Sequence, residues 1–214
     1  MIMEGRGLPA KAAFPDSFSY GNEAVETVSY DPEGAKKLLE ESGWKDTDGD
    51  GYADKDGQKL TIDWLTYPTR LEQPKLAEYA QATLKEIGID VVVNNTSDHM
   101  TYAADGNFDV YVSSTTTAPT GDPEYFFTST VVGPKNYGKY ENKEVTALTE
   151  KLHQAFEPEE RAKLATELQQ KILDDDGFFF VSHLNMGIVT KSNVKGMAAH
   201  PCDYYEITAD LDVE

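Results

Sequence analysis

The stretch that decides the fold is residues 60–93, LTIDWLTYPTRLEQPKLAEYAQATLKEIGIDVVV. Its first seven residues alternate apolar and polar side chains, which is typical of a strand with one buried face. Apolar residues then recur at helical spacing from Leu76 to Ile87, and Gly88 is a residue type that commonly ends a helix. The β-branched run 89–93 predicts a second strand. A strand–helix–strand unit of this length predicts two parallel strands joined by a right-handed crossover.

Helix and strand signals flank this unit on both sides. The pair Asp31-Pro32 places a capping side chain before a proline at the first helical position, and Gly43 ends that helix. Pro158 marks the restart between two further helices. The expected elements are helices at 31–42, 142–156 and 158–173, a short helix at 123–127, a strand at 108–112 and a β-hairpin of 178–182 with 186–190. Together they predict the α/β class, with a mixed sheet and flanking helices.

The charge balance excludes several kinds of partner. The 214 residues carry 38 Asp and Glu against 19 Lys and Arg, a formal net charge of −19. A nucleic-acid binder would present a basic face to phosphates, and an anionic membrane surface would repel this chain. No stretch approaches the roughly 20 apolar residues of a membrane span. Cys202 stands alone, which excludes an internal disulfide and a cysteine-based metal site.

An acidic turn follows the first helix. Asp46, Asp48 and Asp50 occupy alternate positions before Gly51, which matches the start of a calcium loop. The bidentate glutamate that should close such a loop is replaced by Gly57. Two interpretations therefore stay open, a solvated turn of Asp and Gly residues and a weak calcium site.

The four histidines form no short-spaced pair, so a self-contained zinc site is not expected. We expect His153 to be solvated on a helix surface and His99 to lie in a polar turn. His183 ends the apolar run 178–182, where a sheet edge presents side chains to ligands. His200 precedes a proline in a turn that leads to a tyrosine pair. For His183 and His200, an ordinary structural role remains the alternative.

Motifs of the common enzyme classes are missing from the sequence. It contains no nucleophile elbow, phosphate-binding loop, dinucleotide fingerprint or kinase set, so we expect no catalytic activity. Tyrosine is plentiful instead, and amphipathic aromatics at loop ends suit the recognition of small polar ligands, although half of them are expected simply to cover the sheet. The expected ligand contacts are Tyr111, Tyr137, Tyr204 and Tyr205.

Several short patterns occur in a fixed order along nearly the whole chain. They are DPExAKKLL at 31–39, GW at 43–44, DGDG at 48–51, LKEIGI at 84–89, FDV at 108–110, GDP at 121–123, NYG at 136–138, PEER at 158–161 and VKG at 194–196. Together they resemble the extracytoplasmic solute-binding proteins of ABC importers, bacterial family 5. More narrowly, they are similar to the cluster that handles oligopeptides, dipeptides and nickel.

The end of the chain is most similar to the nickel-binding branch of that family, through FVSHL at 180–184 and HPxDYYE at 200–206. This resemblance implies that His183 supplies an imidazole to nickel bound with a small chelator, and that His200 is a second ligand. Neutral imidazole suits nickel. Nickel would then be the cargo, and no cofactor is obligatory. The alternatives are a receptor lobe for oligopeptides or dipeptides without metal, and a calcium-stabilised interaction module.

Length is the departure from the family, whose members are far longer and consist of two lobes. The resemblance therefore implies that residues 1–214 are one C-terminal lobe of a type II-like periplasmic-binding-protein fold. Its parts would be an extended crossover arm at 1–29, an α/β core at 30–195, and a tail at 196–214 towards the missing N-terminal lobe. The implied partners are a small solute and an ABC permease, and the implied location is extracytoplasmic, in the periplasm or lipid-anchored. Residues 1–7 do not resemble a secretory leader.

Overall fold

The computed structural model describes residues 2–199 and 207–214. Their Cα atoms group into two compact units. One unit comprises Ile2 with residues 28–114, and the other joins residues 3–27 to the described part of 115–214. The residues expected to form an arm therefore group with the second half of the chain. The assignment of the whole chain to a single lobe stays a prediction.

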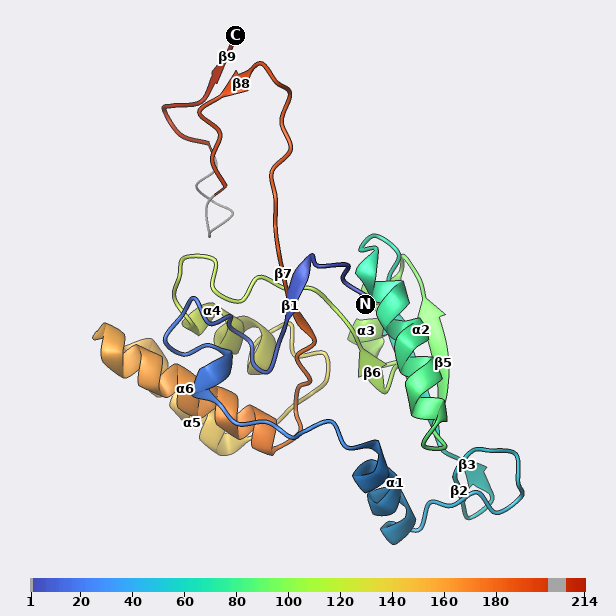
Figure 1. The fold of residues 1–214 in the computed structure, drawn as a ribbon. Helices are drawn as coiled ribbons and strands as arrows, with labels where there is room; N and C mark the ends of the chain where they lie inside the picture. The colour runs from blue at the N-terminus through green and yellow to red at the C-terminus, as the bar shows by residue number, and fades with distance from the viewer. Residues whose placement is uncertain (1, 200–206) are drawn as a thin grey trace. The chain divides into compact units, whose positions relative to one another are not determined.

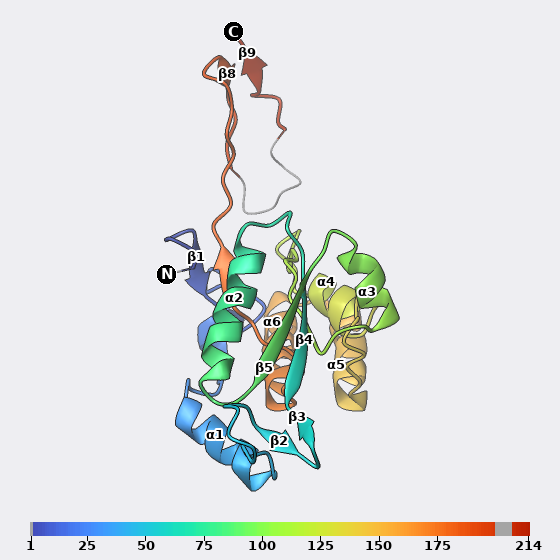
Figure 2. The same ribbon diagram turned by 90° about the vertical axis from the view of Figure 1, so that its right-hand side faces the viewer.

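A three-stranded parallel sheet with strand order β5-β4-β6 lies in the 28–114 unit. Strand β4 (Thr61–Thr66) pairs in parallel with β5 (Asp90–Asn95) over six residues and with β6 (Val110–Tyr111) over two. Helix α2 (Glu72–Lys85) connects β4 to β5 and packs along β5 (Figure 2). The parallel strand–helix–strand unit predicted from residues 60–93 is thus confirmed.

Smaller elements complete this unit. Helix α1 (Pro32–Glu41) begins as predicted, because the Asp31 carboxylate accepts a hydrogen bond of 2.9 Å from the backbone N–H of Gly34. The short strands β2 (Asp54–Lys55) and β3 (Gln58–Lys59) form an antiparallel pair after the acidic turn. Helix α3 (His99–Asp105) ends at Gly106, which takes the left-handed conformation that glycine adopts without strain.

Helices dominate the other unit. Helices α5 (Lys143–Gln154) and α6 (Pro158–Asp174) lie side by side (Figure 1), as their apolar periodicity predicts. Helix α4 (Glu124–Phe126) runs on into the π-helical turn η2 (Phe127–Val131), so this helical segment is longer than the one expected at 123–127. None of the described helices is both long and apolar enough to cross a membrane.

Phe14 lies at the centre of the core of this unit. Its side chain is completely buried, and its ring centroid lies 5.0 to 6.3 Å from those of Phe18, Tyr20, Phe126 and Phe127. Helices α5 and α6 contribute Val145, Leu148, Leu152, Ala165, Leu168 and Ile172 to the same cluster. Residues near the start of the chain therefore supply the middle of a core whose remainder comes from residues 126–172.

The start of the chain is also held by a strand pairing. Strand β1 (Gly7–Pro9) runs antiparallel to β7 (Ser182–Leu184), with Leu8 opposite His183. The hairpin predicted for 178–182 with 186–190 is therefore wrong, since the partner of β7 lies near the other end of the chain. A second antiparallel pair joins β8 (Val194–Lys195) to β9 (Asp212–Val213).

Removing the Phe14 ring tests this description of the core. We expect Phe14→Ala to lower the free energy of unfolding by about 3–5 kcal/mol, because the ring is completely buried and its loss leaves a cavity. The matched control is Phe156→Ala, since Phe156 is 88% exposed and its loss should change stability by less than about 0.5 kcal/mol. Urea denaturation followed by circular dichroism measures both. Equal effects of the two substitutions would contradict the assignment of Phe14 to the core.

Candidate functional site

His183 sits in the middle of β7 with a half-buried ring. Burial lowers the pKa of its imidazole below the ordinary 6.5, and the charge of Asp16 opposes this shift without cancelling it. The ring is therefore neutral at neutral pH. A neutral imidazole has one nitrogen that carries a proton and one that carries a lone pair able to bind a metal.

The Asn22 side chain is the hydrogen-bonding partner of this ring. It lies in the short 3-10 helix η1 (Asn22–Ala24), is 7% exposed, and places Oδ1 3.1 Å from Nε2 of His183. The same Oδ1 accepts hydrogen bonds from the backbone N–H groups of Lys11 at 2.9 Å and Ala12 at 3.1 Å. Asn22 therefore joins the imidazole to the backbone that follows β1.

A second buried amide fastens the same part of the chain. Gln169 of α6 is completely buried, and its Oε1 accepts a hydrogen bond of 3.1 Å from the backbone N–H of Ala13. Its Nε2 donates to the backbone oxygen of Tyr20 at 2.8 Å. Neither amide carries a signal in the sequence, because the groups they contact are distant along the chain or irregular in spacing.

Tyr111, a predicted ligand contact, lies on β6 of the 28–114 unit and forms a cluster with two other rings. Its hydroxyl is 2.7 Å from Nδ1 of His99, and the His99 ring stacks on Tyr67 at a centroid distance of 4.1 Å. His99 begins helix α3, so its expected position in a polar turn is wrong. The local reason is that α3 starts at this residue, directly after the polar segment 96–98.

Tyr137 follows η2 and is half-buried. Its backbone N–H donates to the carbonyl oxygen of Lys135 at 2.9 Å. His200, Tyr204 and Tyr205 lie outside the described residues. Their expected ligand contacts, like those of Tyr111 and Tyr137, stay predictions.

The acidic turn has the geometry of a self-contained loop. Ligand oxygens of Asp46, Asp48 and Asp50 lie within 4.8 Å of one another, and all three residues are exposed. Both carboxylate oxygens of Asp46 accept backbone hydrogen bonds, from Gly49 at 2.7 Å and Gly51 at 3.0 Å. These bonds are the ones that a solvated Asp and Gly turn requires, and a calcium ion would compete with them for the oxygens.

Arg161 forms a constellation that the sequence did not indicate. Its five N–H donors are all used: Asp122 accepts from Nε at 2.8 Å and Nη2 at 2.6 Å, Glu124 from Nη2 at 2.9 Å, and the carbonyl oxygens of Leu152 and Ala155 from Nη1 at 2.6 Å each. The guanidinium therefore ties α6 to the end of α5 and to the start of α4.

The carboxylates around Arg161 are held ionised. Burial alone would raise the pKa of Asp122 and Glu124, but hydrogen bonds and charge from Arg161 lower both pKa values below the ordinary range. His153 adds a contact of 2.7 Å from Nδ1 to Oε1 of Glu124. His153 is exposed on the surface of α5, as expected, with 74% of its side chain accessible, and this contact is an addition to that expectation. We interpret this closed network as structural.

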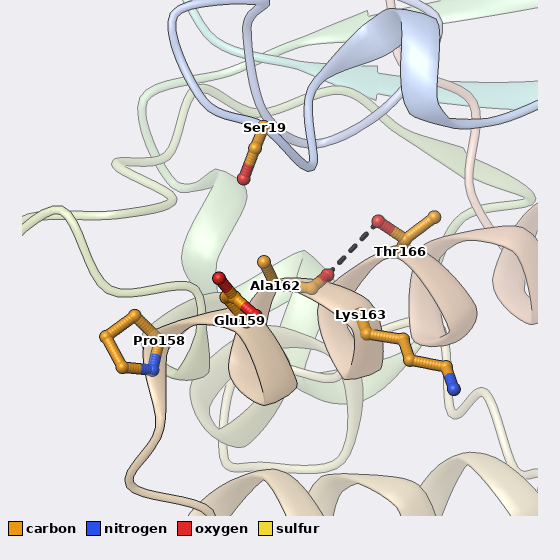
Figure 3. A pocket seen from close by; sticks show the side chains of 6 residues that line it. All are labelled: Ser19, Pro158, Glu159, Ala162, Lys163 and Thr166. Carbon is orange, nitrogen blue, oxygen red and sulfur yellow. Dashed lines mark hydrogen bonds between the residues drawn. The ribbon is translucent and has the colours of Figure 1, made fainter.

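A shallow hollow of about 410 Å³ lies at the start of α6 (Figure 3). Its lining consists of Ser19, Pro158, Glu159, Ala162, Lys163 and Thr166. The Thr166 hydroxyl donates to the Ala162 carbonyl oxygen at 3.1 Å and so serves its own helix. None of the predicted site residues that the structure describes lines this hollow.

Comparison with known proteins gives the chain a family context. The family model described as bacterial extracellular solute-binding proteins, family 5 Middle, matches residues 1–138. The oligopeptide-binding protein AppA of Bacillus subtilis is 28% identical over 200 residues, which cover 90% of this chain and 37% of AppA. The structure of AppA with a nonapeptide matches with a TM-score of 0.78 at 25% identity, covering 94% of this chain and 41% of that one.

Two nickel-binding proteins are also similar to the chain. The nickel-binding periplasmic protein of Escherichia coli is 34% identical over 122 residues, covering 56% of this chain and 23% of the relative. The nickel-binding protein NikA of Staphylococcus aureus is 26% identical over 216 residues, covering 100% of this chain and 42% of NikA. The chain thus spans about two fifths of the length of AppA and of NikA.

The Arg161 network predicts a stability effect with a defined pH dependence. Arg161→Gln should lower the free energy of unfolding by about 2 kcal/mol at neutral pH, because carboxylates and helix-end carbonyls lose a shared charged donor. The pKa values of Asp122 and Glu124 are lowered in the folded protein, so this stabilisation is present above the ordinary carboxyl pKa and is lost as the pH falls through the lowered values.

Urea denaturation of wild type and Arg161→Gln at several pH values measures this effect. The difference between the two proteins should shrink on acidification below about pH 4. Lys163→Gln, an exposed substitution on the same helix, is the control and should be neutral at every pH. A difference that does not change with pH would contradict the role assigned to the two carboxylates.

The geometry of the acidic turn predicts that the thermal stability of the protein does not depend on calcium. Because its carboxylates already bond to the backbone of the turn, the melting temperature should be the same with calcium as with a chelator. Differential scanning fluorimetry compares the two conditions. A clear rise with calcium that disappears in Asp48→Asn would instead support the calcium-stabilised interaction module.

Proposed function

The chain belongs to the family 5 bacterial extracellular solute-binding proteins, and from this premise we propose that it is part of the receptor of an ABC importer. Such a receptor binds a small solute outside the cytoplasm and delivers it to a permease in the membrane, without chemistry on the solute. The match over residues 1–138 and the structural similarity to AppA support the proposal.

We propose further that this chain supplies one wall of the binding site. It spans 37% of AppA and 42% of NikA, which leaves room in such receptors for a second lobe. Hinge closure of two lobes encloses a ligand and removes it from water. The chain by itself should therefore bind its solute more weakly than a receptor that also has the other lobe.

Nickel, held together with a small chelator, is the cargo that we propose. The observation that carries this choice is the half-buried, neutral imidazole of His183, which can coordinate nickel without first losing a proton. Similarity to the nickel-binding proteins of Escherichia coli and Staphylococcus aureus supports it. His200 is the second proposed ligand. Tyr111, Tyr137, Tyr204 and Tyr205 are proposed contacts for the chelator.

A peptide is the second candidate cargo. AppA, an oligopeptide-binding protein, is 28% identical over 90% of this chain, and its structure was determined with a nonapeptide. In a peptide receptor, the His183 ring would form a hydrogen bond to the ligand and would not coordinate a metal. The two cargoes therefore differ in what they demand of the same side chain.

Calorimetric titration of the chain separates these cargoes. We expect heat of binding with nickel and L-histidine together, and an affinity loss of at least about tenfold in His183→Ala, because a ligand atom is removed. His153→Ala is the matched control, since His153 is an exposed imidazole paired with Glu124. The nickel affinity of His153→Ala should equal that of wild type. If nickel bound unspecifically to surface histidines, this substitution would lower the affinity.

Three results would count against the proposal. Binding of a nonapeptide without binding of nickel and histidine would replace the proposed cargo by a peptide. Nickel affinity unchanged in His183→Ala would overturn the choice of site. Equal losses in His183→Ala and His153→Ala would show that nickel binds to histidines in general.

A further inference from the structure

We propose that Asn22 is a positioning residue that fixes which nitrogen of His183 is presented to a metal. The inference rests on the proposed function, because it concerns the ligand atom of the proposed nickel site. It assigns Nε2 as the protonated nitrogen and Nδ1 as the coordinating one.

The orientation of the Asn22 amide is determined by its backbone partners. Two backbone N–H groups, of Lys11 and Ala12, point at one atom of the amide at 2.9 and 3.1 Å. Only an oxygen can accept from both, since an amide nitrogen is a donor. The other end of the amide lies 3.3 Å from the carbonyl oxygen of Pro9, to which a nitrogen can donate. The atom facing His183 is therefore Oδ1.

The orientation of Asn22 then determines the tautomer of His183. Oδ1 can only accept, so the Nε2 atom 3.1 Å away must carry a hydrogen and donate it. In the neutral ring, the lone pair is then on Nδ1. Among the described residues, the structure gives Nδ1 of His183 no hydrogen-bonding partner. This nitrogen is the one left for a ligand.

Fixing the tautomer matters for metal binding because only the unprotonated nitrogen coordinates. Ligating histidines almost always donate their other N–H to a fixed acceptor, which sets the orientation of the ring and raises its basicity. Asn22 is suited to this role because it is only 7% exposed and because its Oδ1 is fixed by hydrogen bonds from the backbone N–H groups of Lys11 and Ala12. Ring orientation is thus coupled to the docking of residues 9–22.

The tautomer of wild-type His183 can be read directly by NMR. Long-range proton–nitrogen correlation spectra of the chain labelled with nitrogen-15 histidine distinguish protonated from unprotonated ring nitrogens. Above the lowered pKa, we expect His183 to show a protonated Nε2 and an unprotonated Nδ1. His153 is the internal reference for a protonated Nδ1, because this nitrogen donates to the Glu124 carboxylate at 2.7 Å. The spectrum of His183→Ala assigns the signals.

Two substitutions of Asn22 extend the test to nickel. Asn22→Ala removes the acceptor and should weaken nickel–histidine binding about ten- to a hundredfold. Asn22→Asp keeps an oxygen acceptor for His183, Lys11 and Ala12, and should restore both the tautomer and the affinity. Asn185→Ala is the matched control, because this exposed asparagine follows β7 and bonds to the arm at Gly5 without touching the imidazole.

The outcomes separate this inference from the proposed function. A protonated Nδ1 in wild-type His183, or a tautomer ratio unchanged in folded Asn22→Ala, overturns the role of Asn22. The wild-type spectrum decides the first of these points even where Asn22→Ala fails to fold. Absence of nickel–histidine binding by the wild-type chain, with Nε2 protonated, instead overturns the proposed cargo.

Discussion

Burial of the Phe14 ring joins parts of the chain that are more than one hundred residues apart. The ring lies against Phe126 and Phe127, and the residues that precede and follow it in sequence pair with β7 and hydrogen-bond to α6. Asn22, the partner of His183, lies on the same segment. The environment of the imidazole therefore exists only while the arm is docked, so the proposed site depends on a core contact.

Hydrophobic burial alone would not place the arm in one register. Gln169 of α6 provides that specificity, because its Oε1 accepts from the backbone N–H of Ala13 and its Nε2 donates to the backbone oxygen of Tyr20. Asn22 lies on the arm itself and fixes the local fold of the arm by accepting from Lys11 and Ala12. A shift of the arm by one residue would break the bonds of Gln169 to Ala13 and Tyr20 and would leave a buried amide unsatisfied, which costs more than an ordinary hydrogen bond contributes. The geometry around His183 is thus set by polar groups and stabilised by apolar ones.

Local signals predicted most of the regular structure. Asp31 before Pro32, Pro158 at a helix start, and the alternation in 60–66 each act within a few residues, so they predicted the start of α1, the start of α6 and strand β4. The partner of β7 could not be predicted in this way, because strand pairing across the chain leaves no local pattern.

The candidate site likewise combines residues that the local sequence indicated with residues that it did not. His183 was predicted as a ligand from its place after an apolar run and from the family resemblance. Its partner Asn22 and the Arg161 network depend on contacts across the chain. The motifs GDP at 121–123 and PEER at 158–161 were part of the resemblance to the solute-binding family. Their physical meaning, a bond between Asp122 and Arg161, appeared only in the folded chain.

The two polar constellations of this unit differ in a way that bears on function. Arg161 uses all five of its N–H donors on protein acceptors, and a group satisfied in this way has no capacity left for a solute. His183 uses one nitrogen on Asn22, and the described residues offer its other nitrogen no partner. A half-buried lone pair of this kind can be satisfied by a ligand that brings a metal ion or a hydrogen-bond donor. The imidazole is therefore the better candidate for cargo recognition, and the guanidinium the better candidate for stability.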